Sequence, residues 1–149
     1  MIGPHAARSL CARLWRWVRA VQDAREQRGR AAMQRARADQ RARALLLTLL
    51  NEEQRGEFEA RGYFHVSGGG SGDRYRIRAD SAVNVDVFGA DGLVRFHLCA
   101  RPTGDIPMCD VMASQLLYLQ DRSTEARFLE QANRHVTLLF PPMAVLLER

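Results

Sequence analysis

The sequence contains no lysine, because all 22 basic residues of the 149-residue chain are arginine. This absence excludes enzymes that form a Schiff base on a lysine and nucleotide-binding loops that need a lysine for the phosphates. No stretch approaches the roughly 18 consecutive apolar residues of a membrane-spanning helix. The chain has three cysteines and no recognisable secretory signal. We therefore expect free thiols in a reducing compartment rather than a disulfide framework.

The arginines are unevenly distributed along the chain. Residues 8–43 hold eleven arginines and three acids, a net charge of +8, whereas the rest holds eleven arginines and fourteen acids, a net charge of −3. Such asymmetry indicates a basic arm that meets a polyanion or an anionic surface. The other interpretation is a solvated helix that only keeps the chain soluble. We predict a basic amphipathic helical arm (residues 1–44), a small α+β body (45–135) and an apolar tail containing prolines (136–149).

The first part of the arm, residues 8–22, is predicted to be an amphipathic helix. At 100° per residue, apolar side chains fall on one side and arginines on the other. This pattern favours docking into a partner's apolar groove or self-association; a membrane-surface helix and a mitochondrial presequence are the alternatives. The predicted apolar contact residues are Leu10, Leu14, Trp15, Trp17, Val18 and Val21.

The second part of the arm, residues 23–44, alternates alanine with arginine and has no apolar stripe. Glu26 with Arg30 and Asp39 with Arg43 have the i,i+4 spacing of helical ion pairs. Arginine-rich helices bind phosphate backbones through bidentate contacts without reading sequence. The predicted polyanion-binding residues of the whole arm are Arg8, Arg13, Arg16, Arg19, Arg28, Arg30, Arg35, Arg37, Arg41 and Arg43.

The body is predicted to contain an antiparallel meander of four strands followed by two helices. Asn51 is a typical N-cap for a helix over residues 52–61, and Gly62 is the expected C-terminal glycine. Alternating apolar residues predict strands at 63–66, 74–79, 83–89 and 93–100. Helical patterns follow up to residue 120 and at 124–134. Two prolines then predict an extended C-terminal tail.

Alternation also predicts the two faces of the sheet. Arg74, Arg76, Arg78 and Arg95 share the polar face, where they form a secondary basic face for nucleic acid or an acidic protein patch. Asn84, Asp86, His97 and Cys99 are expected beside them. Phe88 is the one strong candidate there for stacking on a base, so a solvated sheet face is the favoured interpretation.

Three further motifs receive a structural interpretation. The glycine-rich segment 68–72 lies between two strands, which favours a mobile hairpin tip over a phosphate cradle. His97, Cys99 and Cys109 do not have the paired spacing of a zinc site, and buried structural cysteine is the favoured interpretation. A nucleophile pair of Cys109 and His97 is the least favoured alternative. We expect no catalytic residues, metal or cofactor.

Scattered motifs of the body resemble a group of small uncharacterised proteins from bacteria and their phages, which also carry a basic helical leader. The resemblance covers residues 44–134 and implies an architecture but no mechanism. The residues that carry it are Gly62-Tyr63-Phe64, Tyr75-Arg76-Ile77, Asn84-Val85, Cys99, Pro102, Pro107, Asp110, Met112, Gln115-Leu116 and Ala132-Asn133-Arg134.

We therefore expect a non-enzymatic interaction protein that docks onto a larger assembly through its arginine-rich helix. The assembly is a phage particle, a nucleoprotein or a multi-subunit complex, and the expected location is the cytoplasm or a phage particle. A protein assembly is the favoured partner, with nucleic acid, an anionic membrane surface and self-association left open. The alternative is a peripheral membrane-surface protein anchored by residues 8–22.

Overall fold

The computed structural model describes residues 4–79, 83–100 and 102–135, and it describes side chains in the first helix from Trp15 onward. The predicted tail, residues 136–149, lies outside the described residues. The chain divides into two compact units, Met1–Gln40 and Arg41–Arg149. Its architecture is α+β, with a long N-terminal helix and an antiparallel sheet, as predicted.

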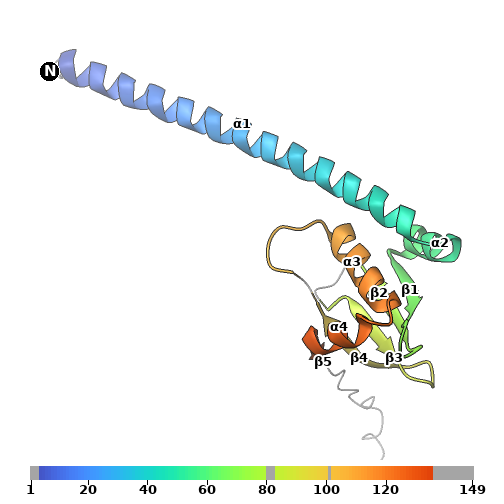
Figure 1. Cartoon of the computed structure of the whole chain (residues 1–149). Coiled ribbons are helices and arrows are strands. Elements are labelled where there is room, and N and C mark those ends of the chain that lie inside the picture. The colour runs from blue at the N-terminus through green and yellow to red at the C-terminus, as the bar shows by residue number, and fades with distance from the viewer. Residues whose placement is uncertain (1–3, 80–82, 101, 136–149) are drawn as a thin grey trace, which may run out of the picture. The chain divides into compact units, whose positions relative to one another are not determined.

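Helix α1 is a single helix of 46 residues, Pro4–Leu49 (Figure 1). Its length follows from a composition rich in alanine, arginine, glutamine and leucine, with no proline after the first position. The helix runs past residue 44, where the sequence placed the end of the arm. Its last turns carry Ala42 and Leu46, which are buried with Leu50 in the second unit. The C-terminal end of α1 is therefore part of the hydrophobic core of the body.

Helix α2, Glu52–Arg61, begins and ends where the sequence predicted. The side chain of Asn51 accepts a hydrogen bond from the Gln54 backbone N–H at 2.9 Å, and the Gln54 side chain accepts one from the Asn51 N–H at 3.2 Å. This capping box satisfies two backbone donors at the start of the helix. Gly62 ends α2 with a φ of 71°, a left-handed conformation that glycine adopts without a Cβ penalty.

Among the described residues, the sheet has five antiparallel strands in the order of the chain: β1 (Tyr63–Ser67), β2 (Arg74–Arg78), β3 (Val85–Phe88), β4 (Val94–Cys99) and β5 (Asn133–His135). The first four are the predicted meander. The fifth corrects the sequence prediction, because the helix expected to reach residue 134 ends earlier, as α4 (Glu125–Gln131). The next residues pair with β4, Leu98 opposite Arg134, and so cover an edge whose backbone groups would otherwise lack partners.

One face of the sheet is covered by α3 (Met108–Gln120), and α3 packs against α4 (Figure 1). The core lies between these helices and the sheet. Its fully buried members include Leu46, Phe64, Tyr75, Ile77, Val85, Leu98, Met112, Leu116 and Leu119.

The opposite side of the sheet is called the outer face below. It carries Tyr63, His65, Arg74, Arg76, Arg78, Asp86, Phe88, His97 and Cys99, which alternate with the core residues along their strands. The exposed Arg95 lies at a β-bulge beside this face, because the register shifts between the pairs Val87–Phe96 and Phe88–Val94. Asn84 was expected on this face, but it precedes β3 and points the other way. Its side-chain amide donates to Gln115 of α3 at 2.7 Å, so two buried amides satisfy each other within the core.

Candidate functional site

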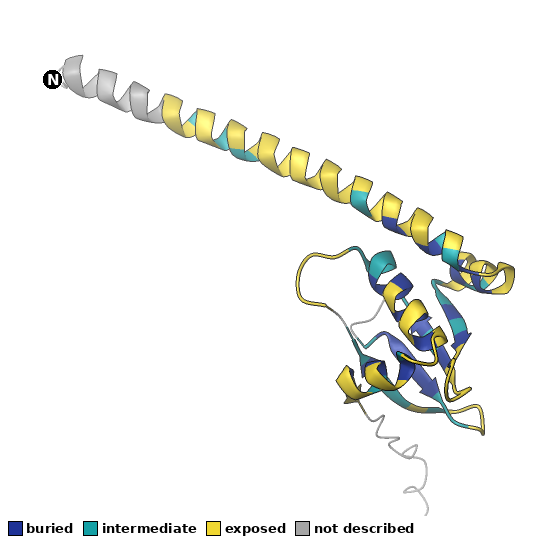
Figure 2. Ribbon diagram, viewed as in Figure 1, coloured by how far each residue is buried: buried dark blue, intermediate teal, exposed yellow. Residues whose placement is uncertain are grey.

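The first candidate site is the exposed segment of α1, residues 15–40. Within it no residue is buried (Figure 2). Trp15, Trp17 and Met33 are 71%, 63% and 60% exposed, whereas Val18 and Val21 are half-buried. The side chains of Leu10 and Leu14, the other members of the predicted apolar stripe, lie outside the described residues. Exposed indoles on a polar helix are typical of a surface that a partner covers.

The arginines of the exposed segment face water. The predicted polyanion-binding residues described there are all exposed: Arg16, Arg19, Arg28, Arg30, Arg35 and Arg37. The predicted pair of Glu26 with Arg30 is confirmed at 3.6 Å, and both side chains are well exposed, so the pair contributes little stability. The side chains of Arg8 and Arg13 lie outside the described residues.

Arg41 and Arg43 differ from the other predicted arm residues, because they belong to the second unit. The Arg43 guanidinium lies 5.8 Å from the centre of the Phe58 ring of α2. This cation–π contact helps to fix the end of α1 on the body. Of the predicted polyanion-binding residues, Arg43 thus has a structural contact of its own.

The second candidate site is the outer face of the sheet, which is organised around one fully buried carboxylate, Asp86 of β3. Arg76 Nε donates to Asp86 Oδ2 at 2.7 Å, and an Arg78 terminal nitrogen donates to Oδ1 at 3.1 Å. His97 Nδ1 lies 2.5 Å from the same Oδ1. Two arginines and a histidine thus surround a carboxylate that would be costly to bury alone.

This cluster changes the predicted secondary basic face. Arg76 and Arg78 are engaged by Asp86, whereas Arg74 and Arg95 are exposed and form no ion pair with another residue that the structure describes. The strand register explains the cluster, because Asp86 lies directly opposite Arg76 on β2 and opposite His97 on β4. The alternation pattern placed Arg76, Arg78, Asp86 and His97 on one face. It did not predict the ion pairs among them, because it did not fix the register of the strands.

A second contact between a carboxylate and a histidine lies at the β1 edge of this face. Glu57 of α2 accepts a hydrogen bond from the His65 backbone N–H at 2.8 Å, and its other oxygen lies 2.7 Å from His65 Nδ1. Burial by itself would raise the pKa of Glu57, but the hydrogen bonds from His65 outweigh it and hold the pKa below its ordinary value. The His65 ring is thereby fixed in orientation.

The glycine-rich segment 68–72 forms the predicted tip between β1 and β2, and it is hydrogen-bonded to Glu125 of α4, a contact that the sequence did not predict. The backbone N–H groups of Gly70 and Ser71 donate to Glu125 Oε2 at 2.7 and 2.9 Å, and the Tyr75 hydroxyl donates to Oε1 at 2.7 Å. A Cβ on Gly69 would collide with the backbone of Gln120. The backbone donors that a phosphate would need are therefore occupied by a carboxylate of the same chain.

The pKa values of this cluster follow from its geometry. Burial alone would raise the pKa of Glu125, but the hydrogen bonds from Ser71, Tyr75 and Gly70 lower it below its ordinary value. Burial raises the pKa of the Tyr75 hydroxyl, and the neighbouring Glu125 carboxylate raises it further. Tyr75 therefore stays protonated and acts as a donor.

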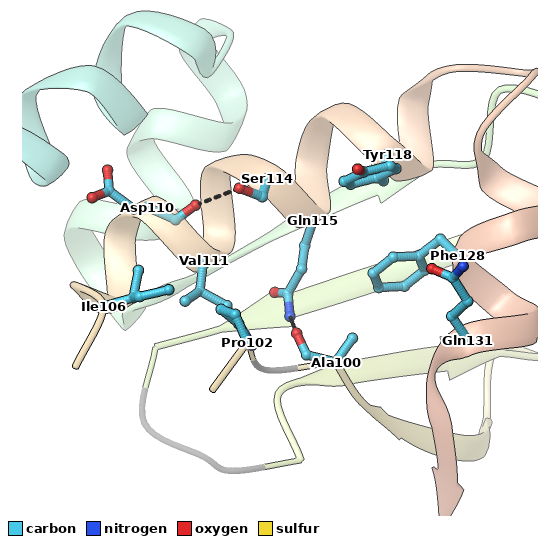
Figure 3. A pocket seen from close by; sticks show the side chains of 10 residues that line it. All are labelled: Ala100, Pro102, Ile106, Asp110, Val111, Ser114, Gln115, Tyr118, Phe128 and Gln131. Carbon is cyan, nitrogen blue, oxygen red and sulfur yellow. Dashed lines mark hydrogen bonds between the residues drawn. The ribbon is translucent and has the colours of Figure 1, made fainter. Parts of the chain in front are cut away.

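A groove of about 480 Å³ lies between α3, α4 and the segment before α3 (Figure 3). Its lining is mainly apolar and includes Ile106, Val111, Tyr118 and Phe128. The Tyr118 and Phe128 rings stack with their centres 6.3 Å apart. Sequence reasoning missed the groove because it forms only when α3 and α4 pack together.

Cys109 and His97, the least favoured nucleophile pair, lie in different places in the fold. Cys109 packs against the hydrophobic core, whereas His97 lies on the outer face of the sheet. Within residues 4–79, 83–100 and 102–135, no group of three His, Cys, Asp or Glu residues could hold a metal ion. In the same part of the chain, no helix is both long and apolar enough to cross a membrane.

Comparison with protein-family models, with curated proteins and with solved structures found no match for this chain. Function is therefore inferred from the two candidate surfaces themselves.

Proposed function

We propose that this chain is a non-enzymatic interaction protein that docks onto a larger assembly through the exposed segment of α1. The observation that supports it is the lack of any buried residue between Trp15 and Gln40, although two tryptophans and a methionine stand there. A helix that is polar nearly all round gains little from its own packing. Burial against a partner gives such a helix the tertiary stabilisation that it lacks alone.

The tryptophans supply the apolar part of the contact. Burying an exposed indole removes on the order of 150 Å² from water. At about 25 cal/mol per Å², this stabilises a complex by roughly 4 kcal/mol before the costs of ordering are subtracted. Trp15 and Trp17 are therefore the residues whose removal weakens docking most.

The arginines supply the polar part of the contact. Exposed guanidinium groups form bidentate hydrogen bonds with carboxylates or phosphates, and a field of one sign speeds the approach of an acidic partner. Phage particle, nucleoprotein and multi-subunit complex all present such groups. Salt dependence separates a phosphate backbone from apolar docking, because binding to a phosphate backbone falls steeply with added salt, whereas apolar docking does not.

The test is the mass of the native complex. The chain is purified from its native source at low salt, and its complexes are measured by size-exclusion chromatography with light scattering. We expect the 16.9 kDa chain in a particle several times its own mass. The double variant Trp15→Ala/Trp17→Ala and the double variant Arg16→Gln/Arg19→Gln should release the chain from that particle.

The matched controls remove the same kinds of group from the body. Leu93→Ala deletes a side chain that is 64% exposed, close to the 63% of Trp17, and Arg127→Gln removes one exposed charge from α4. Both should leave the complex intact. A wild-type chain that elutes alone, or arm variants that stay in the complex, would contradict the proposal. Flotation with anionic vesicles that depends on Trp17 would favour the membrane-surface alternative instead.

A further inference from the structure

Rings and guanidinium groups alternate on the outer face of the sheet. The Arg76 guanidinium lies 5.3 Å from the centre of the Tyr63 ring and 5.5 Å from that of the Phe88 ring. The Arg74 guanidinium also lies over the Phe88 ring, 5.6 Å from its centre. The centre of the His65 ring lies 5.6 Å from the centre of the Tyr63 ring and 5.8 Å from the centre of the Phe88 ring. These five residues are called the aromatic–arginine ladder.

The ladder is held in place by residues that do not belong to the hydrophobic core. Asp86 binds Arg76, and Glu57 orients the His65 ring. Tyr63, His65 and Phe88 are all half-buried, so part of each side chain meets solvent. The rings are therefore already oriented on an open face, so less side-chain entropy is lost when a ligand binds to them.

The charge around the ladder favours an anionic ligand. Five arginines lie on or beside the face, against the carboxylates of Asp86 and Glu57, which already have partners. Arg74 and Arg95 remain exposed, and Arg61 donates to the Tyr63 hydroxyl at 3.0 Å. Each exposed guanidinium can meet a phosphate at the border of the ring surface.

We propose that the outer face binds a single-stranded nucleic acid, with bases stacked on Tyr63, His65 and Phe88 and phosphates on Arg74 and Arg95. Rings on an open sheet with arginines beside them suit unpaired bases, because a duplex hides its base faces. The ring centres are 5.6 and 5.8 Å apart and the ring planes are inclined by 83° and 49°, so the rings suit separate unpaired bases and not one continuous parallel stack. An acidic peptide would bind the arginines but would not stack on the exposed parts of the rings.

The experiment compares two probes on the full chain by fluorescence anisotropy: a labelled oligothymidylate of about ten nucleotides, and a duplex of the same length. The variants Tyr63→Leu and Phe88→Leu remove a ring but keep apolar volume. Each should weaken binding of the single strand by about tenfold, while binding of the duplex stays unchanged. Tyr118→Leu is the control, because it removes an aromatic ring that is 48% exposed on α3, away from the outer face.

A second variant keeps the test valid if a ring variant fails to fold. Arg95→Gln changes only an exposed side chain, and it should reduce the salt dependence of single-strand binding by about 0.7 in the log–log slope. The proposal is overturned if the ring variants and Arg95→Gln leave single-strand binding unchanged. It is also overturned if polyglutamate displaces the oligonucleotide and the ring variants have no effect on either ligand.

The inference does not depend on the proposed function of α1. Arginines of the exposed segment are expected to bind either probe through charge alone. The double variant Trp15→Ala/Trp17→Ala should therefore leave the preference for the single strand intact. Loss of that preference in this variant would assign the nucleic-acid contact to α1 and not to the sheet.

Discussion

The arginines of α1 and those of the sheet are the same residue type in opposite situations. Between residues 15 and 40 they lie on a helix with no buried residue, where Arg28 Nε donates to the Ala24 carbonyl at 3.3 Å and Arg30 lies 3.6 Å from Glu26. On the sheet, Arg76 and Arg78 surround the fully buried Asp86. A buried acid therefore engages Arg76 and Arg78 in the fold, whereas the exposed segment of α1 has no buried acid. Four substitutions, each with a counterpart in α1 or on α4, test this difference.

The largest effect is expected where α1 enters the core. Leu46 is fully buried, whereas Met33 on the same helix is 60% exposed. Leu46→Ala should lower the free energy of unfolding of the body by about 3–4 kcal/mol, through lost burial and the cavity left behind. Met33→Ala should change it by less than about 0.5 kcal/mol. Urea denaturation of both variants measures the difference. Equal losses of stability would contradict the view that Leu46 belongs to the core and Met33 does not.

Removal of the buried carboxylate of Asp86 is expected to cause the next largest loss of stability. Asp86→Ala leaves Arg76, Arg78 and His97 without their shared partner, and it should cost about 3 kcal/mol of stability. Asp23→Ala in the exposed segment should cost less than about 0.5 kcal/mol. Thermal unfolding followed by circular dichroism compares the two. A mild loss in Asp86→Ala would show that the sheet arginines do not depend on this acid.

The same substitution should have opposite effects at two glycines. A Cβ on Gly69 would collide with the Gln120 backbone, so Gly69→Ala should destabilise the body by about 2 kcal/mol. Gly29 lies inside α1 with no heavy atom within 4 Å of an added Cβ. Gly29→Ala should therefore favour the helix by about 1 kcal/mol. The readouts are urea denaturation for Gly69→Ala and the far-ultraviolet helical signal for Gly29→Ala; a harmless Gly69→Ala would contradict the anchored loop.

The smallest effect has a pH signature. The folded-state pKa of Glu125 lies below its ordinary value of 4.5, so its ionised form stabilises the fold. This contribution is full above the unfolded-state pKa and is lost as the pH falls through the folded-state pKa, below 4.5. Glu125→Gln should cost about 1–2 kcal/mol at pH near 7, and the gap to the wild type should close in acid. Glu130→Gln, which changes an exposed acid of the same helix, should show neither effect.

The sequence was sufficient for α2, for the first four strands and for the faces of most of their residues, with Asn84 as an exception. Asn51 with Gly62 defined α2, and alternation in Arg74 to Arg78 defined the two faces of β2, because capping and strand periodicity depend only on neighbouring residues.

The parts that the sequence did not predict depend on long-range contacts. The Glu125 side chain binds a loop more than 50 residues earlier in the chain, and β5 forms only because β4 presents an open edge. Sequence reasoning considered Phe88 the one strong stacking residue of the outer face. Tyr63 and His65 join it because the β1–β2 register places His65 opposite Arg76, and no local pattern fixes that register.

Hydrogen exchange along α1 tests the central claim most directly. Exchange is measured by mass spectrometry for the chain alone and for the chain in its native complex. In the chain alone, residues 15–40 should exchange faster than residues 41–49, which are held by the core. In the complex, residues 15–40 should become protected while the body changes little. Unchanged exchange in residues 15–40, with new protection confined to the body, would contradict the account.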